Sequence, residues 1–346
     1  VWVCREHLQD PSVQSIVVNS GNANACTGDE GMSNARQMTE LTANALSIPS
    51  DQVLVCSTGV IGQQLPMDKI EAGIAEAATQ LSTTGGRDTA EAIMTTDTIP
   101  KEIAVEVEIS GQPVRIGGTA KGSGMIAPNM ATMLGFITTD VVITPDLLQT
   151  CLSEANELSF NRITVDSDTS TNDTVLLLAT ASAEHPKIES TDDPAYQTFS
   201  RGLIYVCTEL AKMIARDGEG ATKLVEVLIL NAQTKSDALK TGRAVAESPL
   251  VKTAIFANDA NWGRFMMAIG KSGAIFDPYR VGVYISDYQI VKDGMDAGYS
   301  EEIASQQLCA EEVKIRIDLQ AGPASATFWT CDYSYDYIRI NADYRT

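Results

Sequence analysis

The chain has 346 residues, of which 44% are hydrophobic and 20% are charged, a balance typical of a folded globular protein rather than a disordered one. Its 45 acidic and 25 basic residues give a formal net charge of −20, which makes nucleic acids and anionic membranes poor partners. The apolar runs are strand-sized and no charged, apolar leader opens the sequence, so we expect a soluble, cytoplasmic protein.

The N-terminal part of the chain is predicted to alternate strands and helices. Residues 1–4 predict a strand already under way, which suggests that further residues precede them in the natural protein. Residues 15–19 and 53–56 predict buried strands that end in turn-forming residues. Residues 33–48 have the apolar spacing of an amphipathic helix, and an alanine-rich helix is predicted at 67–81. The apolar face of the first helix consists of Met38, Leu41, Ala45 and Ile48.

The rest of the chain continues the same alternation. Strands are predicted at 103–109, 114–116, 174–181, 221–229, 313–319 and 337–340, and the first two of them are joined by a turn at 110–113. Helices are predicted at 194–215 and near 237–247. A further helix begins with Thr144 as its cap and Pro145 at its first position. The order predicts an α/β fold, a mixed-sheet sandwich with helices packed on the sheets, and leaves the strand order open.

Three loops are rich in small and polar residues that core packing does not require. Loops 19–25 and 57–62 directly follow strands, and their glycines let backbone N–H groups approach an anionic atom closely. Each of them alone is equally well explained as a tight turn, and neither matches a glycine-rich phosphate-binding pattern. Loop 117–136 is long for a compact domain and too apolar toward its C-terminal side for a disordered linker. Its length indicates a functional loop.

Histidine and cysteine are used in ways that restrict the chemistry. The only histidines, His7 and His185, lack metal-ligand spacing and are interpreted as surface residues, so no zinc site is expected. The seven cysteines form no Cys-x-x-Cys pair, and their odd number argues against a complete disulfide framework. We expect most of them to be buried, inert thiols in a reducing compartment. A serine or cysteine hydrolase normally needs a histidine base, so an acyl-transfer enzyme built from this chain would need another base.

Ala131 and Thr132 offer such a base within loop 117–136. They directly precede the strand-like residues 133–138, so breaking the bond between them would place Thr132 at the head of a strand. An N-terminal threonine carries its own base, because its α-amino group has an unperturbed pKa of ~7.7–8.0. General bases work best when their pKa lies near the working pH. This arrangement is one of the known activated nucleophiles and requires no histidine.

Eight stretches resemble the ornithine acetyltransferase family of arginine biosynthesis. They are NSGNANACTG (19–28), STGVIG (57–62), MTTDT (94–98), TAKGSGMIAPNMATML (119–134), VDSDTSTNDT (165–174), DGEGATK (217–223), NWGR (261–264) and NADYRT (341–346). The resemblance covers essentially the whole chain in order, and the fourth stretch is the most specific. Members usually carry additional residues ahead of the point where this chain begins.

The resemblance implies an N-terminal-nucleophile-like fold that cleaves itself between Ala131 and Thr132. The products would be an α-chain, 1–131, and a β-chain, 132–346, that stay associated. Thr132 would attack the acetyl carbonyl of N2-acetylornithine, release ornithine and pass the acetyl group to glutamate in a ping-pong reaction. The oxyanion hole falls on the Thr58 hydroxyl and the Gly59 N–H, donors typically worth a few kcal/mol each. No cofactor is implied, and the use of acetyl-CoA as a second acetyl donor stays open.

The resemblance also implies a set of substrate contacts. The positions are Thr95, Lys121, Thr132, Glu219, Asn341 and Thr346. Lys121 suits the carboxylate and Glu219 the ammonium group of an amino-acid substrate. Taken singly, Lys121 is better explained as a solvated loop lysine, Glu219 as a turn residue, and the last two positions as part of a frayed chain end. The ordered match of the eight stretches favours the substrate contacts instead. Family precedent favours an assembly of two αβ pairs, a heterotetramer.

Other interpretations remain open from the sequence. Asn22, Asn24 and residues 166–173, including Asp166 and Asp173, are interpreted as polar groups that satisfy buried loop backbone. Water in place of glutamate as the acceptor would make the chain an N-terminal-nucleophile aminopeptidase or amidase. A chain that is never cleaved would instead be an amino-acid-binding protein without activity. The mass of the purified protein separates cleaved from uncleaved chains.

Overall fold

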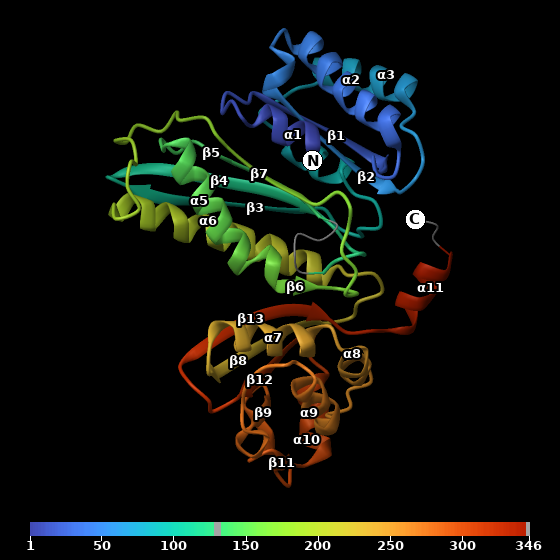
Figure 1. Ribbon diagram of the computed structural model, residues 1–346, viewed down its shortest axis with the longest axis vertical. Helices are drawn as coiled ribbons and strands as arrows, with labels where there is room; N and C mark the ends of the chain where they lie inside the picture. The colour runs from blue at the N-terminus through green and yellow to red at the C-terminus, as the bar shows by residue number, and fades with distance from the viewer. Residues whose placement is uncertain (128–132, 344–346) are drawn as a thin grey trace.

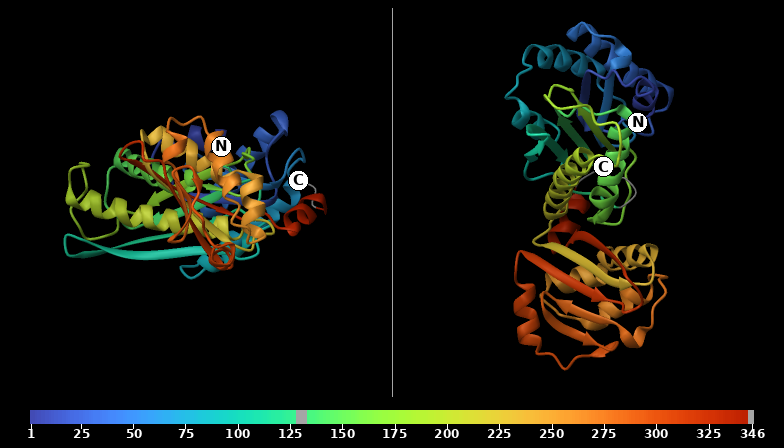
Figure 2. Two further views of the ribbon diagram at one scale, coloured as in Figure 1. Left: turned by 90° about the horizontal axis from the view of Figure 1, so that it is seen from below. Right: turned by 90° about the vertical axis from the view of Figure 1, so that its left-hand side faces the viewer.

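The structure is a computed structural model that describes residues 1–127 and 133–343. It contains three sheets, and Figure 1 shows them as an upper part with two sheets and a lower part with one. Figure 2 shows the same two parts following one another along the long axis. The predicted α/β class, with helices packed on mixed sheets, is confirmed.

The first sheet is a parallel pair of strands at the top of Figure 1. β1 (Ser15–Asn22) pairs in register with β2 (Val53–Val60), so the ends of both strands lie at the same edge. The helices packed around this pair are α1 (Trp2–His7), α2 (Gly28–Leu46) and α3 (Met67–Thr79). β2 is buried along most of its length because its apolar residues face helices on one side and the second sheet on the other.

The second sheet has the order β3-β4-β5-β7. Its strands are β3 (Lys101–Ile109), β4 (Gln112–Lys121), β5 (Leu134–Thr139) and β7 (Thr174–Ala179). Ser110 and Gly111 both have positive φ, which is the geometry of a tight two-residue hairpin between β3 and β4. β4 and β5 are antiparallel, with Ile116 opposite Thr139 and Lys121 opposite Leu134. This ladder joins the segments on either side of residues 128–132.

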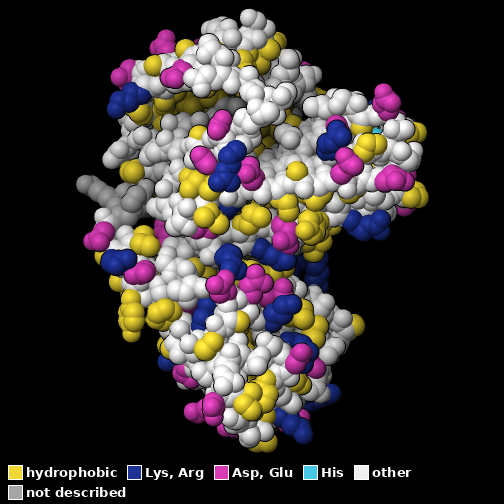
Figure 3. Space-filling view, turned by 180° about the vertical axis from the view of Figure 1, so that it is seen from behind, with side chains coloured by type: hydrophobic (Ala, Val, Ile, Leu, Met, Phe, Trp, Pro, Cys, Tyr) yellow, Lys and Arg dark blue, Asp and Glu magenta, His cyan; other side chains and the backbone are white. Residues whose placement is uncertain are grey.

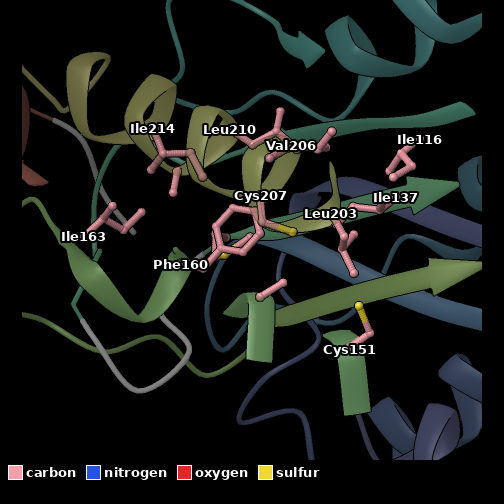
Figure 4. Close-up of a cluster of buried hydrophobic side chains, with 14 of the residues drawn as sticks. Ile116, Ile137, Cys151, Phe160, Ile163, Leu203, Val206, Cys207, Leu210 and Ile214 are labelled. Carbon is pink, nitrogen blue, oxygen red and sulfur yellow. The ribbon is translucent and has the colours of Figure 1, made fainter. Parts of the chain in front are cut away.

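Two long helices cover one face of the second sheet. They are α5 (Pro145–Leu158) and α6 (Pro194–Arg216). The apolar side of α6 packs against β3 and β4, and Figure 4 shows its residues Leu203, Val206 and Leu210 among the side chains of this core. The opposite face of the sheet meets the first sheet through residues of β5 and β7, including Phe136. The upper part is therefore layered, with two sheets between helices.

The third sheet forms the lower part and has the order β11-β10-β9-β12-β8-β13-β6. Its strands are β6 (Ile163–Thr164), β8 (Leu224–Ala232), β9 (Gly282–Ile285), β10 (Tyr288–Lys292), β11 (Met295–Asp296), β12 (Glu312–Asp318) and β13 (Ala324–Cys331). The helices of this part are α7 (Lys235–Ala246), α8 (Pro249–Phe256), α9 (Trp262–Gly270) and α10 (Glu301–Leu308). They and the sheet enclose a separate apolar core.

The remaining elements are short. α4 (Gly86–Ala92) precedes β3, and 3₁₀ helices lie at Ser50–Gln52, Phe160–Arg162 and Pro278–Arg280. The last helix, α11 (Tyr335–Asp343), buries none of its described residues, and Figure 1 shows it apart from the third sheet. The return of the chain from β13 to α11 brings the C-terminal segment close to the junction of the two parts.

Several local predictions are wrong. Residues 2–4 belong to helix α1 and Val1 directly precedes it, because an apolar run this short does not distinguish a strand from a helix whose Val3 and Cys4 face inward. Residues 337–340 belong to helix α11 for the same reason. Ala45 is exposed on α2, and the helix ends before Ile48. Thr144 does precede α5, with Pro145 at its start, but its side chain makes no capping hydrogen bond.

Candidate active site

The end of β2 supplies the two residues predicted to form an oxyanion hole. Thr58 is 2% exposed and Gly59 follows it, opposite Gly21 at the end of β1. Gly59 has a φ of 126°, a conformation that favours glycine. A Cβ at this position would lie 2.2 Å from the carbonyl carbon of Gly21. The close approach of the two strand ends therefore requires glycine at position 59.

Lys121 ends β4 and is 2% exposed, although the sequence alone is compatible with a solvated loop lysine. Its ammonium donates hydrogen bonds to the Thr95 hydroxyl at 2.7 Å and to the Thr58 hydroxyl at 3.4 Å. The carboxylate of Asp97 lies 3.6 Å from the same nitrogen. Burial lowers the pKa of Lys121 below its usual value, and the Asp97 charge acts against this shift. The lysine predicted from loop 117–136 is thus a buried strand residue.

Lys121 contacts a buried cluster of side chains with alternating positive and negative charges. The Lys101 ammonium lies 2.6 Å from Asp97 Oδ1 and 2.6 Å from Asp217 Oδ2. Asp97 also accepts hydrogen bonds from the backbone N–H of Thr95 and, at 2.6 Å, of Gly122. Burial acts to raise the pKa of Asp97, but the two ammonium groups outweigh it and hold the pKa below the usual value. Asp97 and Asp217 lie in two of the eight matching stretches, but no sequence pattern predicts a role for them.

Glu219 occupies another side of the same region. It is 8% exposed, and its carboxylate accepts a 2.8 Å hydrogen bond from the Asn341 side chain on α11. A Cβ on Gly124 would lie 2.4 Å from this carboxyl group, so only glycine leaves room for it. The backbone N–H of Glu219 donates to the Ser123 carbonyl at 2.9 Å. The segment after β4 therefore fixes the position of Glu219.

These side chains surround a cavity of about 450 Å³. Of the predicted site residues, it is lined by Thr58, Gly59, Thr95, Lys121, Glu219 and Asn341. They come from segments far apart in the sequence, yet the fold brings them to one place. A cavity of about 630 Å³ between β1, α2 and α3 has a largely apolar lining that includes none of the predicted site residues. The smaller cavity is the candidate active site because its polar groups of both charges converge.

Three predicted residues lie outside the described parts of the chain, namely Ala131, Thr132 and Thr346. The residue that follows Thr132 is described. The backbone N–H of Met133 donates a 3.0 Å hydrogen bond to Asp173 Oδ1. Burial raises the pKa of Asp173 to about 8, although this hydrogen bond acts to lower it. Its other oxygen, Oδ2, is buried and has no hydrogen-bond partner among the described residues.

The acidic loop before β7 satisfies backbone groups, as predicted. Asp166 accepts hydrogen bonds from the N–H groups of Met125 at 2.5 Å and Ile126 at 2.8 Å, and Asp173 accepts from Met133. Asp166 and Asp168 also line the 450 Å³ cavity, which the sequence analysis did not foresee. Burial raises the pKa of Asp166 to about 6 despite its backbone hydrogen bonds. The loop therefore supports the segment after β4 and adds acidic groups to the cavity.

Neither histidine lines this cavity. His185 is 7% exposed rather than a surface residue, and its Nε2 accepts a hydrogen bond from the N–H of Val142. The ring of His7 hydrogen-bonds to the carbonyl of Val53 at 2.8 Å. Both rings therefore serve local packing. The prediction that His185 is a surface residue is wrong because the chain that carries it packs alongside the segment after β5.

Within residues 1–127 and 133–343, no three His, Cys, Asp or Glu side chains are arranged to hold a metal ion. No helix in these ranges combines the length and apolar character needed to cross a bilayer. Figure 3 shows Lys and Arg interspersed with Asp and Glu, so neither sign forms a continuous patch on that face. All seven cysteines are free, and five are buried.

Known proteins resemble this chain over its whole length. The model of the ArgJ family matches residues 1–346. The arginine biosynthesis bifunctional protein ArgJ of Symbiobacterium thermophilum is 52% identical over 100% of this chain and 86% of that protein. The protein of the same name from Staphylococcus aureus strain Mu50 is 51% identical over 96% of this chain and 80% of that protein. The crystal structure of arginine biosynthesis bifunctional protein argJ from Bacillus halodurans aligns with a TM-score of 0.60 and 44% identity, covering 62% of this chain and 100% of that chain.

Proposed function

The chain belongs to the ArgJ family, and we propose from this that it transfers an acetyl group from N2-acetylornithine to glutamate in the cytoplasm. The products are ornithine and N-acetylglutamate, an intermediate of arginine biosynthesis. The observation that carries the proposal is one cavity lined by a buried cation, Lys121, a buried carboxylate, Glu219, and the proposed oxyanion-hole pair Thr58 and Gly59. Both substrates are amino acids that carry charges of both signs, which suits such a lining.

Thr132 is the nucleophile in this proposal. It becomes the first residue of a separate chain when the bond after Ala131 is broken by its own hydroxyl. The backbone directly after it is held by Asp173 through the N–H of Met133 and continues into β5, beside Lys121 at the end of β4. The ladder between these strands places Leu134 opposite Lys121, which lines the cavity. Because neither histidine lines the cavity, the α-amino group of Thr132 is the base.

The length of one relative of known structure supports cleavage between Ala131 and Thr132. The residues after Ala131 make up about 62% of this chain, and the Bacillus halodurans chain matches 62% of it over its own full length. A separate chain that begins at Thr132 gives a match of this extent. We extend the proposal to an assembly of two such αβ pairs, which is a heterotetramer.

The reaction then runs in two half-reactions. The Thr132 hydroxyl attacks the acetyl carbonyl of N2-acetylornithine, and its proton passes to the α-amino group. The negative oxygen that develops is stabilised by the hydroxyl of Thr58 and the N–H of Gly59. Collapse transfers the proton to the leaving nitrogen, releases ornithine and leaves an acetyl ester on Thr132. The amine of glutamate attacks this ester and restores the hydroxyl. No cofactor takes part, and acetyl-CoA is proposed as a second donor because the relatives are named bifunctional.

The test combines mass spectrometry with a transfer assay. The purified protein is expected to consist of two chains, the second starting at Thr132. With glutamate withheld, N2-acetylornithine should release one ornithine per site and add one acetyl group to the second chain. Adding glutamate should then move that acetyl group to N-acetylglutamate, with parallel lines in the two-substrate kinetics. Release of free acetate instead of N-acetylglutamate would show a hydrolase, and a single intact chain would exclude the N-terminal nucleophile.

A further inference from the structure

The ammonium of Lys121, which lines the cavity, is also held by several protein groups. Its partners are the hydroxyls of Thr95 and Thr58 and the carboxylate of Asp97. An ammonium group has three N–H donors and no acceptor, and two of the three are used by the hydroxyls of Thr95 and Thr58. The Asp97 carboxylate at 3.6 Å adds an ion pair. Lys121 is therefore bound mainly by protein groups, one of which is the Thr58 hydroxyl.

The hydrogen bond to Thr58 fixes where the proton of that hydroxyl can point. Because Lys121 donates, the Thr58 oxygen accepts, and the hydroxyl proton must leave in another direction. No other described residue accepts this proton, and Thr58 lines the cavity. The proton is therefore available to an oxygen atom in the cavity. A neighbouring positive charge also polarises the hydroxyl and makes it a stronger donor.

The charges behind Lys121 keep it in this position. Asp97 bridges Lys121 and Lys101 and is itself held by the backbone N–H groups of Thr95 and Gly122. Asp217 neutralises the second positive charge at 2.6 Å from Lys101. Two ammonium groups thus face two carboxylates, and the buried group as a whole is neutral. Such a cluster is rigid because every member has partners with short contacts.

We propose that Lys121 is a positioning residue that acts through Thr58, orienting and polarising the oxyanion-hole hydroxyl, and that Asp97 holds Lys121 in place. This inference rests on the proposed function, because it assumes that Thr58 stabilises the oxyanion. It differs from the substrate contact that the family resemblance implies for Lys121. A substrate contact matters only when a substrate is bound, whereas a role through Thr58 matters in every reaction that uses the oxyanion hole.

Self-cleavage separates the two roles because it involves no substrate carboxylate. The rate of cleavage before Thr132 is followed by intact mass after synthesis in a cell-free system, in the full chain and in the variants Lys121→Met, Thr58→Ala and the double variant. We expect Lys121→Met to slow cleavage about tenfold or more, the effect of about 1.4 kcal/mol. The double variant should cleave no more slowly than Thr58→Ala, because the lysine acts through the hydroxyl.

Lys252→Met is the matched control. Lys252 is 1% exposed, but its ammonium lies in the lower part against Thr330 and the ring of Tyr333, and it does not line the cavity. Loss of this buried lysine should leave the cleavage rate unchanged. Asp97→Asn, which keeps the size of the side chain, should slow cleavage if Lys121→Met does. It provides a second variant should Lys121→Met fail to fold, as judged by its melting temperature.

The pH dependence gives a readout that a loss of packing would not change. Burial lowers the pKa of Lys121, and its charged form is the active one, so cleavage should decline as the pH rises through a value below that of a free lysine. This decline should be absent in Lys121→Met. Wild-type cleavage by Lys121→Met, or losses that multiply in the double variant, would overturn the inference. A wild-type chain that is never cut before Thr132 would instead overturn the proposed function.

Discussion

The upper and lower parts of the molecule bury charge in different ways. Around the cavity of the upper part, Lys101 lies 2.6 Å from the carboxylates of Asp97 and Asp217, and Lys121 lies 3.6 Å from Asp97. In the lower part the buried ammonium of Lys252 meets a hydroxyl, a carbonyl and an aromatic ring. The surrounding core there is apolar. Removing several charges from water costs free energy. In the upper part such charges are nevertheless buried, at the place where polar groups converge on a cavity.

The largest expected effect is the loss of the cut itself. Thr132→Ala should leave one intact chain without transferase activity, because it removes the hydroxyl that both reactions require. Intact mass and a denaturing gel measure the outcome, and Thr132→Ser, which keeps a hydroxyl, is the matched control. Two chains from the alanine variant would show that cleavage does not depend on this hydroxyl. The buried charges of the upper part would then not be explained by self-cleavage at Thr132.

Removal of one oxyanion donor should have the next largest effect. Thr58→Ala is expected to lower kcat by roughly 10²–10³-fold, the usual consequence of deleting such a donor. Self-cleavage should also slow, because its intermediate is tetrahedral as well. Thr58→Ser keeps the hydroxyl and should stay close to wild type. A folded alanine variant with near-normal turnover would place the oxyanion hole elsewhere in the upper part.

A change in the lower core should affect stability and leave the chemistry unchanged. Ile317 on β12 is fully buried in the apolar core, so Ile317→Ala should lower the free energy of unfolding by about 2–5 kcal/mol. The kcat measured well below the melting temperature should match that of wild type. Ile317→Val removes less of the same side chain and should lower the free energy of unfolding by only about 0.5–1.5 kcal/mol. A fall in kcat without a fall in stability would show that the two parts are coupled more tightly than their separate cores indicate.

The smallest expected effect concerns the histidines. If the α-amino group of Thr132 is the base, activity rises with pH through a limb set by that amine, whose unperturbed pKa is ~7.7–8.0. Replacing His7 and His185 together with glutamine should leave this limb in place, although loss of the His185 hydrogen bonds should cost some stability. The limb should also persist in Asp173→Asn, which removes a carboxyl group with a pKa of about 8. Loss of the limb in either variant would exclude the amine as the base.

Sequence patterns predicted the fold best where they were long. The helix at 194–215 is confirmed nearly residue for residue, because many positions contribute to one period. The hairpin of 103–116 is confirmed in type, but its second strand extends from Gln112 to Lys121, well beyond the predicted 114–116. The four-residue patterns at 1–4 and 337–340 are wrong because packing of neighbouring segments decides such short runs. The order of the strands also depends on contacts between distant segments, which no local pattern encodes.

The sequence predicted which residues form the candidate site better than how these residues are arranged. Six predicted residues line one cavity, and the signal that found them was the resemblance of short stretches in their order along the chain. The same stretches contain Asp97 and Asp217, which an inspection of single residues treats as ordinary surface carboxylates. Their role depends on Lys101, which the fold brings 2.6 Å from both of them. Burial and distance of this kind follow only from the assembled sheets.

The antiparallel ladder between β4 and β5 has a consequence for the reversibility of unfolding. The two strands lie on either side of the proposed cut, so after cleavage one continuous sheet consists of two polypeptides. Before the cut these strands meet within one molecule, and their encounter does not depend on concentration. After the cut the same encounter requires two molecules, so refolding of the denatured, mature protein should become slower on dilution. The lifetime of the mature protein is then governed by its unfolding rate, because each unfolding event separates partners that formed as one chain.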